Sequence, residues 1–138
     1  MKKILLAYDG SRSAEKALRK TFEIAEKFHS AVTIMTVAPE LYLTELVEVD
    51  RKGILEKIRA DAEKTMQKIQ KRARRLRTVK TVIKQGDAAE EILKTAKRIK
   101  ADLIITGSHG RHGASKFLLG SVSAKIIDHA HCAVLIVK

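Results

Sequence analysis

Short apolar runs alternate with longer amphipathic runs along the whole chain, and this alternation restricts the fold more than any other feature. Five apolar runs have the length and composition of buried strands: residues 2–8, 31–37, 78–84, 101–106 and 132–138. Strands that are apolar on both faces and alternate with helices are typical of a parallel sheet covered by helices on both sides. The pattern therefore predicts an α/β fold, with one open five-stranded parallel sheet in a single domain over residues 1–138.

The segments between these runs have the apolar spacing of helices. They cover residues 13–28, 54–76, 88–99 and 123–130. Ser11 and Asp87 precede two of them, where a side-chain oxygen can accept an amide hydrogen of the first turn. Residues 39–51 have no clear period and are expected to form a connection. The first two helices are expected to bury two stripes: Ala14, Ala17, Leu18, Phe22, Ala25 and Phe28, and Ile54, Ile58, Ala62, Met66, Ile69, Ala73 and Leu76.

Composition and the lengths of the apolar runs limit the cellular compartment in which we expect this protein. The first apolar run has five residues before Asp9, too few for the roughly 7–15 residues of a secretory signal core or the roughly 20 of a membrane span. Cys132 is the single cysteine, which excludes an internal disulfide and fits a reducing compartment. We therefore expect a cytoplasmic protein without a membrane partner. Cys132 itself opens an apolar strand, which favours a packed thiol over a reactive one.

Unusual residues follow two of the predicted strands. The first strand ends in Asp9-Gly10, and the fourth is followed by "GSHGRHGASKFLLGS", which holds four of the chain's seven glycines within residues 107–120. In open α/β sheets, ligands bind outside the carboxyl ends of the strands, where the strand order reverses. The pattern alone does not fix that order. The Rossmann-like order 3-2-1-4-5, which we predict, would place the two unusual strand ends side by side.

Each part of this region suits one part of a nucleotide. Gly107, Gly110 and Gly113 permit positive φ angles and let amides approach an anion closely. Gly120-Ser121 precedes the last helix, whose free amides and dipole favour a phosphate. Asp9 would repel phosphates and suits ribose hydroxyls. The alternative is that the glycines only close a loop. The patterns G-x-x-x-x-G-K-[ST] and G-x-G-x-x-G are absent, so this would be a different phosphate cradle.

The spacing Gly107-x2-Gly110-x9-Gly120-Ser121 resembles the G-x2-G-x9-G-[ST] signature of ATP-binding universal stress proteins. The resemblance extends to "ILLAYDGS", "GDAAEEIL", "ADLIITGSHGR" and "LLGSVSAKII", and it spans essentially the whole chain. Members of this family commonly enter the last strand with Pro-Cys-Pro-Val, where this chain has His131-Cys132-Ala133-Val134. That departure concerns the edge strand. His112 stands where small residues are common.

The resemblance implies a regulatory, stress-response module that binds ATP, ADP or AMP, with Mg²⁺ or Mn²⁺ accompanying the phosphates. It places Asp9 and the backbone of Ala7 at the ribose and adenine, and the main chain of Val37 at the adenine. Residues 106–112 would follow the ribose and phosphates, and residues 120–122 would hold the phosphate tail. The implied ATP-binding residues are Ala7, Asp9, Val37, Thr106, Gly107, Ser108, His109, Gly110, Arg111, His112, Gly120, Ser121 and Val122.

Enzymatic alternatives have weaker support in the sequence. His109 and His112 could suggest a metal pair, but a loop pair with no third ligand is more often directed at solvent or phosphate, so no dedicated metal site is expected. There is no G-x-S-x-G elbow, and no residue stands out as a general base for water attack. We therefore expect no catalytic residues and favour a binding module. A slow ATPase or phosphotransferase at the same site is the alternative.

The net charge of +12 is concentrated in one segment. Residues 51–80 hold twelve Lys or Arg against three acids, which gives +9 in that segment. A solvated helix face is the usual meaning of such a pattern. A basic nucleic-acid-binding protein is a second alternative function. Because no aromatic residue lies between Arg51 and Lys80 to stack a base, we expect at most weak, non-specific nucleic-acid binding.

The last strand predicts self-association. "CAVLIV", residues 132–137, is apolar on both faces and ends the chain, so it should form an edge of the sheet. An exposed edge of this kind favours pairing with a second copy, which gives a closed two-fold interface. Dimerisation through this strand is also what the resemblance implies. We therefore expect a homodimer.

Overall fold

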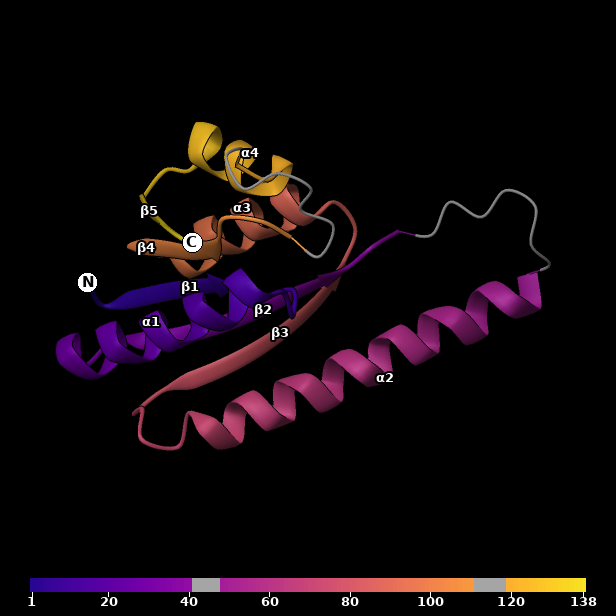
Figure 1. Ribbon diagram of the computed structural model, residues 1–138, viewed down its shortest axis with the longest axis horizontal. Coiled ribbons are helices and arrows are strands. Elements are labelled where there is room, and N and C mark those ends of the chain that lie inside the picture. Colours follow the sequence, from indigo (N-terminus) through magenta and orange to yellow (C-terminus); the bar gives the residue numbers. More distant parts are fainter. Residues whose placement is uncertain (41–47, 111–118) are drawn as a thin grey trace.

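Nine elements alternate between strand and helix along the chain in the computed structural model, which describes residues 1–40, 48–110 and 119–138 (Figure 1). All neighbouring strands are parallel, in the order β3-β2-β1-β4-β5. The predicted fold class and strand order are therefore confirmed. The elements are β1 (Lys3–Ala7), α1 (Arg12–Phe28), β2 (Ala31–Ala38), α2 (Glu48–Arg72), β3 (Val79–Gln85), α3 (Ala88–Ile99), β4 (Leu103–Gly107), α4 (Ser121–His129) and β5 (Ala133–Val137).

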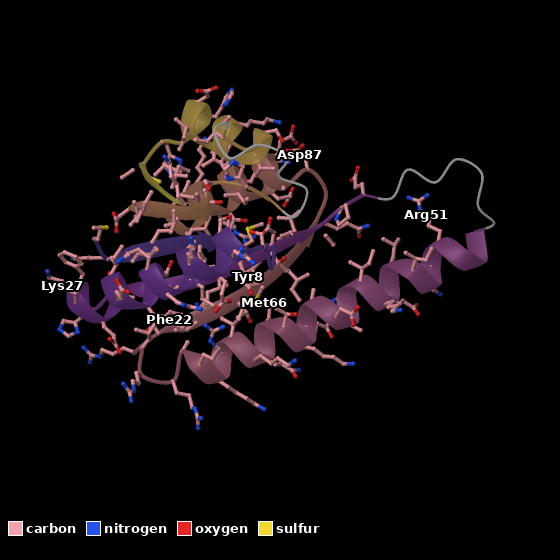
Figure 2. The ribbon with its side chains drawn as sticks, in the orientation of Figure 1. Tyr8, Phe22, Lys27, Arg51, Met66 and Asp87 are labelled. Carbon is pink, nitrogen blue, oxygen red and sulfur yellow. The ribbon has the colours of Figure 1, made fainter. Side chains whose placement is uncertain are left out.

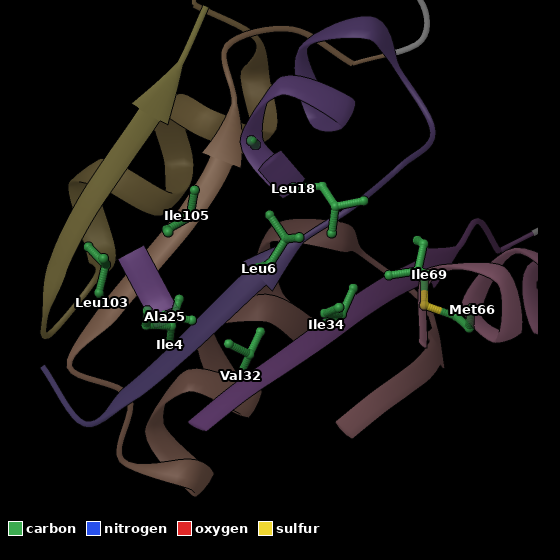
Figure 3. Packing of buried hydrophobic residues seen from close by; sticks show 11 residues of the cluster. Ile4, Leu6, Leu18, Ala25, Val32, Ile34, Met66, Ile69, Leu103 and Ile105 are labelled. Atoms are coloured by element: carbon green, nitrogen blue, oxygen red, sulfur yellow. The ribbon is translucent and has the colours of Figure 1, made fainter. Parts of the chain in front are cut away.

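Helices α1 and α2 cover one face of the sheet. Leu18 of α1 and Met66 and Ile69 of α2 are buried in one cluster with alternate residues of the strands, including Ile4 and Ile34 (Figure 3). Each of these five side chains is at most 3% exposed. Because successive side chains of a strand point to opposite faces, the residues between them must be buried by other helices.

Helices α3 and α4 cover the opposite face. Ala89 and Ile92 of α3 and Ile126 of α4 pack with Leu5 and Met35 of the sheet. The strands are apolar on both faces because both faces are covered, as expected for a parallel sheet. Two helical layers with the sheet between them leave the strand ends as the places where polar chemistry can gather.

The predicted helix starts are confirmed at α1 and α3. The Ser11 hydroxyl accepts a hydrogen bond from the amide of Ala14 at 3.1 Å, and Asp87 Oδ1 accepts one from the amide of Glu90 at 2.9 Å. The predicted burial of Phe28 is wrong, since this side chain is 50% exposed. It lies on the last turn of α1, one residue before His29 ends the helix in the left-handed conformation, at φ 53°.

Helix α2 differs from the prediction in position. It spans Glu48–Arg72 instead of 54–76, because charged residues such as Arg51 and Lys52 are good helix formers even without an apolar period. Met66, Ile69 and Ala73 are buried as predicted, but Ile54 is 38% exposed. The inward orientation predicted for Ile54 is therefore wrong. The first turns of α2 extend past the sheet, with Arg51 near their far end (Figures 1 and 2).

Candidate functional site

The carboxyl ends of β1 and β4 lie side by side in the sheet. Ala7 pairs in register with Thr106, so Asp9 and the stretch from Gly107 to Gly110 follow two adjacent strands. A Cβ atom added at Gly110 would lie 3.2 Å from Asp9 Oδ2, which shows how closely the two segments approach. The predicted meeting of these two strand ends is confirmed.

The turn after β1 fixes the carboxylate of Asp9. Its Oδ1 atom accepts a hydrogen bond from the amide of Ser11 at 2.9 Å. Gly10, between them, has a φ of 78°, a conformation that glycine adopts without steric cost. In the part of the chain that the structure describes, Gly10 and Gly86 are the glycines with positive φ. Gly107 and Gly110 therefore do not adopt the positive φ that glycine permits.

Gly107 is needed for a different reason. A Cβ atom at this position would lie 2.3 Å from Ser13 Oγ and 2.8 Å from the backbone nitrogen of Ala14. Both contacts are far shorter than real Cβ atoms tolerate. The missing side chain therefore lets the first turn of α1 pack directly against the end of β4, which draws the turn after β1 toward the glycine stretch.

Serine hydroxyls join these segments. Ser11 Oγ and Ser13 Oγ donate to the carbonyl oxygen of His109 at 3.2 and 2.7 Å. Ser123 Oγ, from the first turn of α4, donates to the carbonyl oxygen of Gly107 at 2.8 Å. Neither Ser13 nor Ser123 belongs to the motifs from which the site was predicted. The pattern Gly-Ser-x-Ser, which begins at Gly10 and again at Gly120, could have indicated these two serines.

Helix α4 begins at the edge of this site without a capping side chain. It starts at Ser121, two residues before the predicted start, with Gly120 as its cap residue and no side-chain cap hydrogen bond. The amide of Gly120 donates to the carbonyl of Ser108 at 2.9 Å, which fixes the helix start against β4. The first-turn amides of a helix have no intrahelical acceptor, so this end offers free donors and the positive end of a dipole.

His109 contributes a buried donor or acceptor. Its Nδ1 lies 2.8 Å from Ser108 Oγ. Its Nε2 atom is buried and has no hydrogen-bond partner among the residues that the structure describes. An unpaired buried polar atom is costly, so a ligand group that pairs with Nε2 would be favoured here.

Val37 lies near the end of β2, on the other side of β1. The last backbone bond between these strands runs from the amide of Tyr8 to the carbonyl of Met35 at 2.8 Å. Alternate residues of a strand direct their amide and carbonyl toward the same neighbour, so Val37 faces the side of β1 as Met35 does. Its main chain is therefore directed past the end of β1. This is the position that the resemblance gives to an adenine contact.

A polar cluster supports the site from the side of α1 and α2. The Tyr8 hydroxyl donates to Glu15 Oε2 at 3.1 Å, and Arg72 donates to Glu15 Oε1. Burial, followed by the charge of Glu15, raises the pKa of the Tyr8 phenol. The hydrogen bond from Arg72 lowers the pKa of Glu15. This cluster joins α1 and α2 beside Tyr8, the residue immediately before Asp9 (Figure 2).

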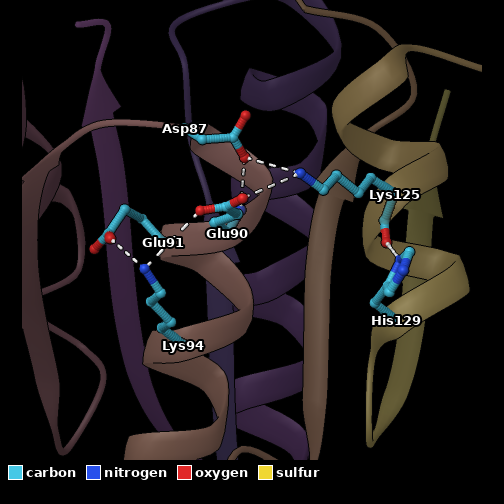
Figure 4. Close-up of polar contacts among 6 residues, drawn as sticks. All are labelled: Asp87, Glu90, Glu91, Lys94, Lys125 and His129. Atoms are coloured by element: carbon cyan, nitrogen blue, oxygen red, sulfur yellow. Dashed lines mark hydrogen bonds and ion pairs between the residues drawn. The ribbon is translucent and has the colours of Figure 1, made fainter.

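A second polar cluster holds α4 against α3 (Figure 4). Lys125 Nζ lies 3.4 Å from Asp87 Oδ1 and 3.6 Å from Glu90 Oε1. The hydrogen bond from the amide of Glu90, followed by the charge of Lys125, lowers the pKa of Asp87. These pairs are solvent-accessible and individually weak. Together with the burial of Ile126 they fix the orientation of the helix whose N-terminus borders the site.

Two of the predicted site residues, Arg111 and His112, lie outside the described residues, as does Gly113. The histidine pair at 109 and 112 is therefore untested. Within the described residues, no group of three or more His, Cys, Asp or Glu side chains could hold a metal ion. Over the same residues, no helix is both long and apolar enough to cross a membrane.

Comparison with known proteins identifies the family. The model of the universal stress protein family matches residues 1–138. The chain belongs to the universal stress protein family. The universal stress protein MJ0531 of Methanocaldococcus jannaschii is 33% identical over 141 residues, which cover 99% of this chain and 82% of the relative. The universal stress protein YxiE of Bacillus subtilis is 34% identical over 146 residues, covering 99% and 98% of the two chains.

Solved structures agree with this assignment. The protein MJ0577 superposes with a TM-score of 0.91 at 33% identity, covering 99% of this chain and 95% of the other. The universal stress protein UspA from Lactobacillus plantarum gives 0.92 at 26% identity, covering 99% and 97%. Two further members of the fold, each 22% identical to this universal stress protein, were solved in complex with cAMP and with dAMP.

Proposed function

We propose that this universal stress protein binds ATP at the joined carboxyl ends of β1 and β4 and acts as a nucleotide-binding regulatory module in a stress response. The observation that carries the proposal is the meeting of three features in one place. These are the carboxylate of Asp9, the buried Nε2 atom of His109, which has no partner among the described residues, and the start of α4 at Gly120, which lacks a side-chain cap. The cAMP and dAMP complexes of two proteins with this fold support an adenine nucleotide as the ligand.

The charges of the site indicate how a bound nucleotide would be oriented. Asp9 is fixed at the end of β1, where a carboxylate suits ribose hydroxyls because its oxygen atoms accept hydrogen bonds. The phosphates would lie at the start of α4, where the amides and the hydroxyl of Ser121 donate to negative oxygen atoms. The adenine would lie beyond the end of β1, against the main chain of Val37. A nucleotide placed in this order keeps its phosphates away from the carboxylate.

A divalent cation fits this scheme without a dedicated protein site. Mg²⁺ binds mainly through substrate phosphates and water, with one or two protein ligands at most. The described residues hold no cluster that would bind it alone, so it would arrive with the nucleotide. When bound, it would offset phosphate charge. We also propose that the protein forms a homodimer through β5. Its single cysteine favours a cytoplasmic location.

Calorimetry with MgATP tests the site. We expect wild-type affinity in the micromolar range or tighter. Asp9→Asn retains an oxygen that can accept the amide of Ser11 but loses the charge, so it should weaken ATP binding while the turn stays formed. Gly120→Val should also weaken binding, because its Cβ would lie 3.3 Å from the carbonyl oxygen of Ser108, at the start of α4. Each loss should be about tenfold or more.

Gly53→Val is the matched control for Gly120→Val. Gly53 lies in α2, and a Cβ added there meets nothing within 4 Å. Its ATP affinity should equal that of the wild type. Unchanged affinity in both Asp9→Asn and Gly120→Val would refute the site assignment. Steady ATP turnover that depends on Asp9 would instead favour the slow ATPase or phosphotransferase alternative.

A further inference from the structure

A cavity with a polar lining lies at the end of the sheet opposite to the candidate nucleotide site. It is a cavity of about 450 Å³ between the amino ends of β1, β2 and β3 and the last turn of α3. In Figure 1 this is the end at which β1 begins, beside the N-terminal label. Strand β1 has five residues, so with a rise of roughly 3.3 Å per residue the cavity lies roughly 16 Å from the site at the carboxyl ends.

Strand register explains why polar side chains meet here. Lys80 pairs with Thr33 in the parallel ladder, so the two lie next to each other on one face. Residues two positions further along β1, β2 and β3, such as Leu5 and Met35, pack in the cluster under α3. Because side chains alternate between faces, Lys3, Thr33 and Lys80 lie on this same face, before the apolar core begins.

Helix α3 closes the cavity with two more cations. Arg98 and Lys100 line it from the end of the helix, where Lys100 takes the left-handed conformation at φ 54°. Cations near a helix C-terminus are favoured by the dipole, which accounts for these two residues without a ligand. It does not account for Lys3 and Lys80, which come from the strands. Four cations from three elements therefore surround one cavity.

Among the described residues that line this cavity, none carries a carboxylate that would balance the charge. Within the described residues, none of the four cations forms an ion pair with a carboxylate. The neighbouring acid, Asp102, is outside the lining, and its Oδ2 atom accepts the amides of Lys2 and Lys3 at 2.8 and 2.9 Å. Like charges around a concave surface repel one another, so an anion in the cavity would relieve this repulsion.

We propose that this cavity is an anion site, separate from the nucleotide site, that binds a compact oligophosphate of two or three consecutive phosphate groups. The volume is within the range of about 300–1,000 Å³ that small-ligand sites occupy. Lysine ammonium groups and an arginine guanidinium are the usual partners of phosphate oxygen atoms. The hydroxyls of Thr33 and Thr78, which also line the cavity, supply neutral donors. This inference does not depend on the proposed ATP site.

Titration with sodium tripolyphosphate tests the proposal, with amide chemical shifts to locate the bound anion. In the wild-type protein we expect the shifts to move at Thr33, Lys80 and Lys100. The double variant Lys80→Gln with Arg98→Gln should weaken this binding about tenfold or more, since two charge-assisted contacts are lost. Both side chains are exposed, so the variant should fold, and its amide spectrum verifies that it does.

The matched control removes the same charge elsewhere. Lys64→Gln with Lys68→Gln neutralises two exposed cations of α2 that do not line the cavity. It should change tripolyphosphate affinity by less than about twofold, because screened surface charges contribute little. Repeating the titration in Gly120→Val removes binding at the start of α4, and affinity at the basic cavity should survive. ATP added to the Gly120→Val variant shows whether the triphosphate of a nucleotide also binds in this cavity.

Three results would overturn the proposal. The first is equal tripolyphosphate affinity in the wild type and in Lys80→Gln with Arg98→Gln. The second is an equal loss in the α2 control, which would mean that only net charge matters. The third is a set of shift changes confined to Gly107 and the start of α4, which would assign the anion to the nucleotide site. Wild-type protein that binds tripolyphosphate at this cavity but does not bind MgATP would contradict the proposed function alone.

Discussion

At the scale of single residues, the glycine motif serves packing as much as ligand binding. Gly107 has no room for a Cβ atom because Ser13 and Ala14 of α1 lie against it. Gly120 is less restricted but still close to its neighbours, since its amide donates to the carbonyl of Ser108 and its Cβ would lie 3.3 Å from the same oxygen atom. Both glycines therefore let chain segments come close together, and Gly120 in addition leaves the first-turn amides of α4 without a capping side chain.

The close packing around Gly107 predicts that a side chain there would lower stability. Gly107→Ala should lower the free energy of unfolding by about 1–3 kcal/mol or more, as overpacking does in a closed site. Gly53→Ala should raise it by up to about 1 kcal/mol, because Gly53 is helical and its Cβ would meet open space. Urea denaturation measures both. A second substitution, Ser13→Gly, should restore only part of the loss, since the backbone nitrogen of Ala14 stays 2.8 Å away.

Residue patterns predicted some residues of this site and missed others. Asp9, Gly107 and Gly120 stand out because their types are unusual at a strand end or a helix start. Ser13 and Ser123 do not, because their role comes from bonds to His109 and Gly107, which lie 96 and 16 positions away. Sequence spacing also cannot distinguish a glycine needed for positive φ from one needed for close approach. The packing around Gly107 makes that distinction.

At the scale of elements, the strands were the most predictable part of the fold. Each predicted strand agrees with the observed one to within about two residues, because strands buried on both faces are continuous apolar runs. Helix α2 was the least predictable. Its first turns lie beyond the sheet, so no buried stripe marks its start at Glu48. The apolar spacing from Ile54 onward identified a helix, but only the part near Met66 is buried.

The basic segment 51–80, which comprises most of α2 and the residues after it, gives a prediction about nucleic acids. Arg51, Lys64 and Arg75 are among twelve Lys and Arg residues of 51–80, and all twelve are exposed. We expect weak binding to duplex DNA of any sequence at low salt, lost near about 0.2 M salt as counterion release becomes less favourable. Fluorescence anisotropy with two unrelated duplexes measures this. MgATP affinity should not change when DNA is present.

Strong binding would contradict that expectation. Sub-micromolar affinity for one duplex over the other at about 0.2 M salt would mean that α2 reads sequence, and it would favour the nucleic-acid-binding alternative. The double variant Lys64→Gln with Lys68→Gln separates the α2 face from the basic cavity. It should weaken DNA binding and leave tripolyphosphate binding unchanged, while Lys80→Gln with Arg98→Gln should affect tripolyphosphate binding more.

At the scale of the whole molecule, the sheet has two polar ends and two edges. The carboxyl end holds the candidate nucleotide site, and the amino end holds the basic cavity. Strands β3 and β5 are the edges. The carbonyl of Val137 accepts a hydrogen bond at 2.8 Å from the amide of Ser108, the residue after β4, so by alternation Val134 and Ile136 direct their backbone groups outward. Val122 and Ile127 of α4, the helix before β5, are 36% and 47% exposed.

These features support the homodimer through β5, and proline substitution tests it. Ile136→Pro removes an outward amide that a partner strand would need, at an edge position where proline is tolerated. Val134→Pro is less suitable, because Val134 packs against the core. Thr81→Pro is the matched control, since Thr81 occupies an outward-facing position on the other edge strand, β3. Sedimentation at tens of micromolar should give a dimer for the wild type and Thr81→Pro, and a monomer for Ile136→Pro. A wild-type monomer would refute the dimer, and a dimer that only Thr81→Pro dissolves would place the interface at β3.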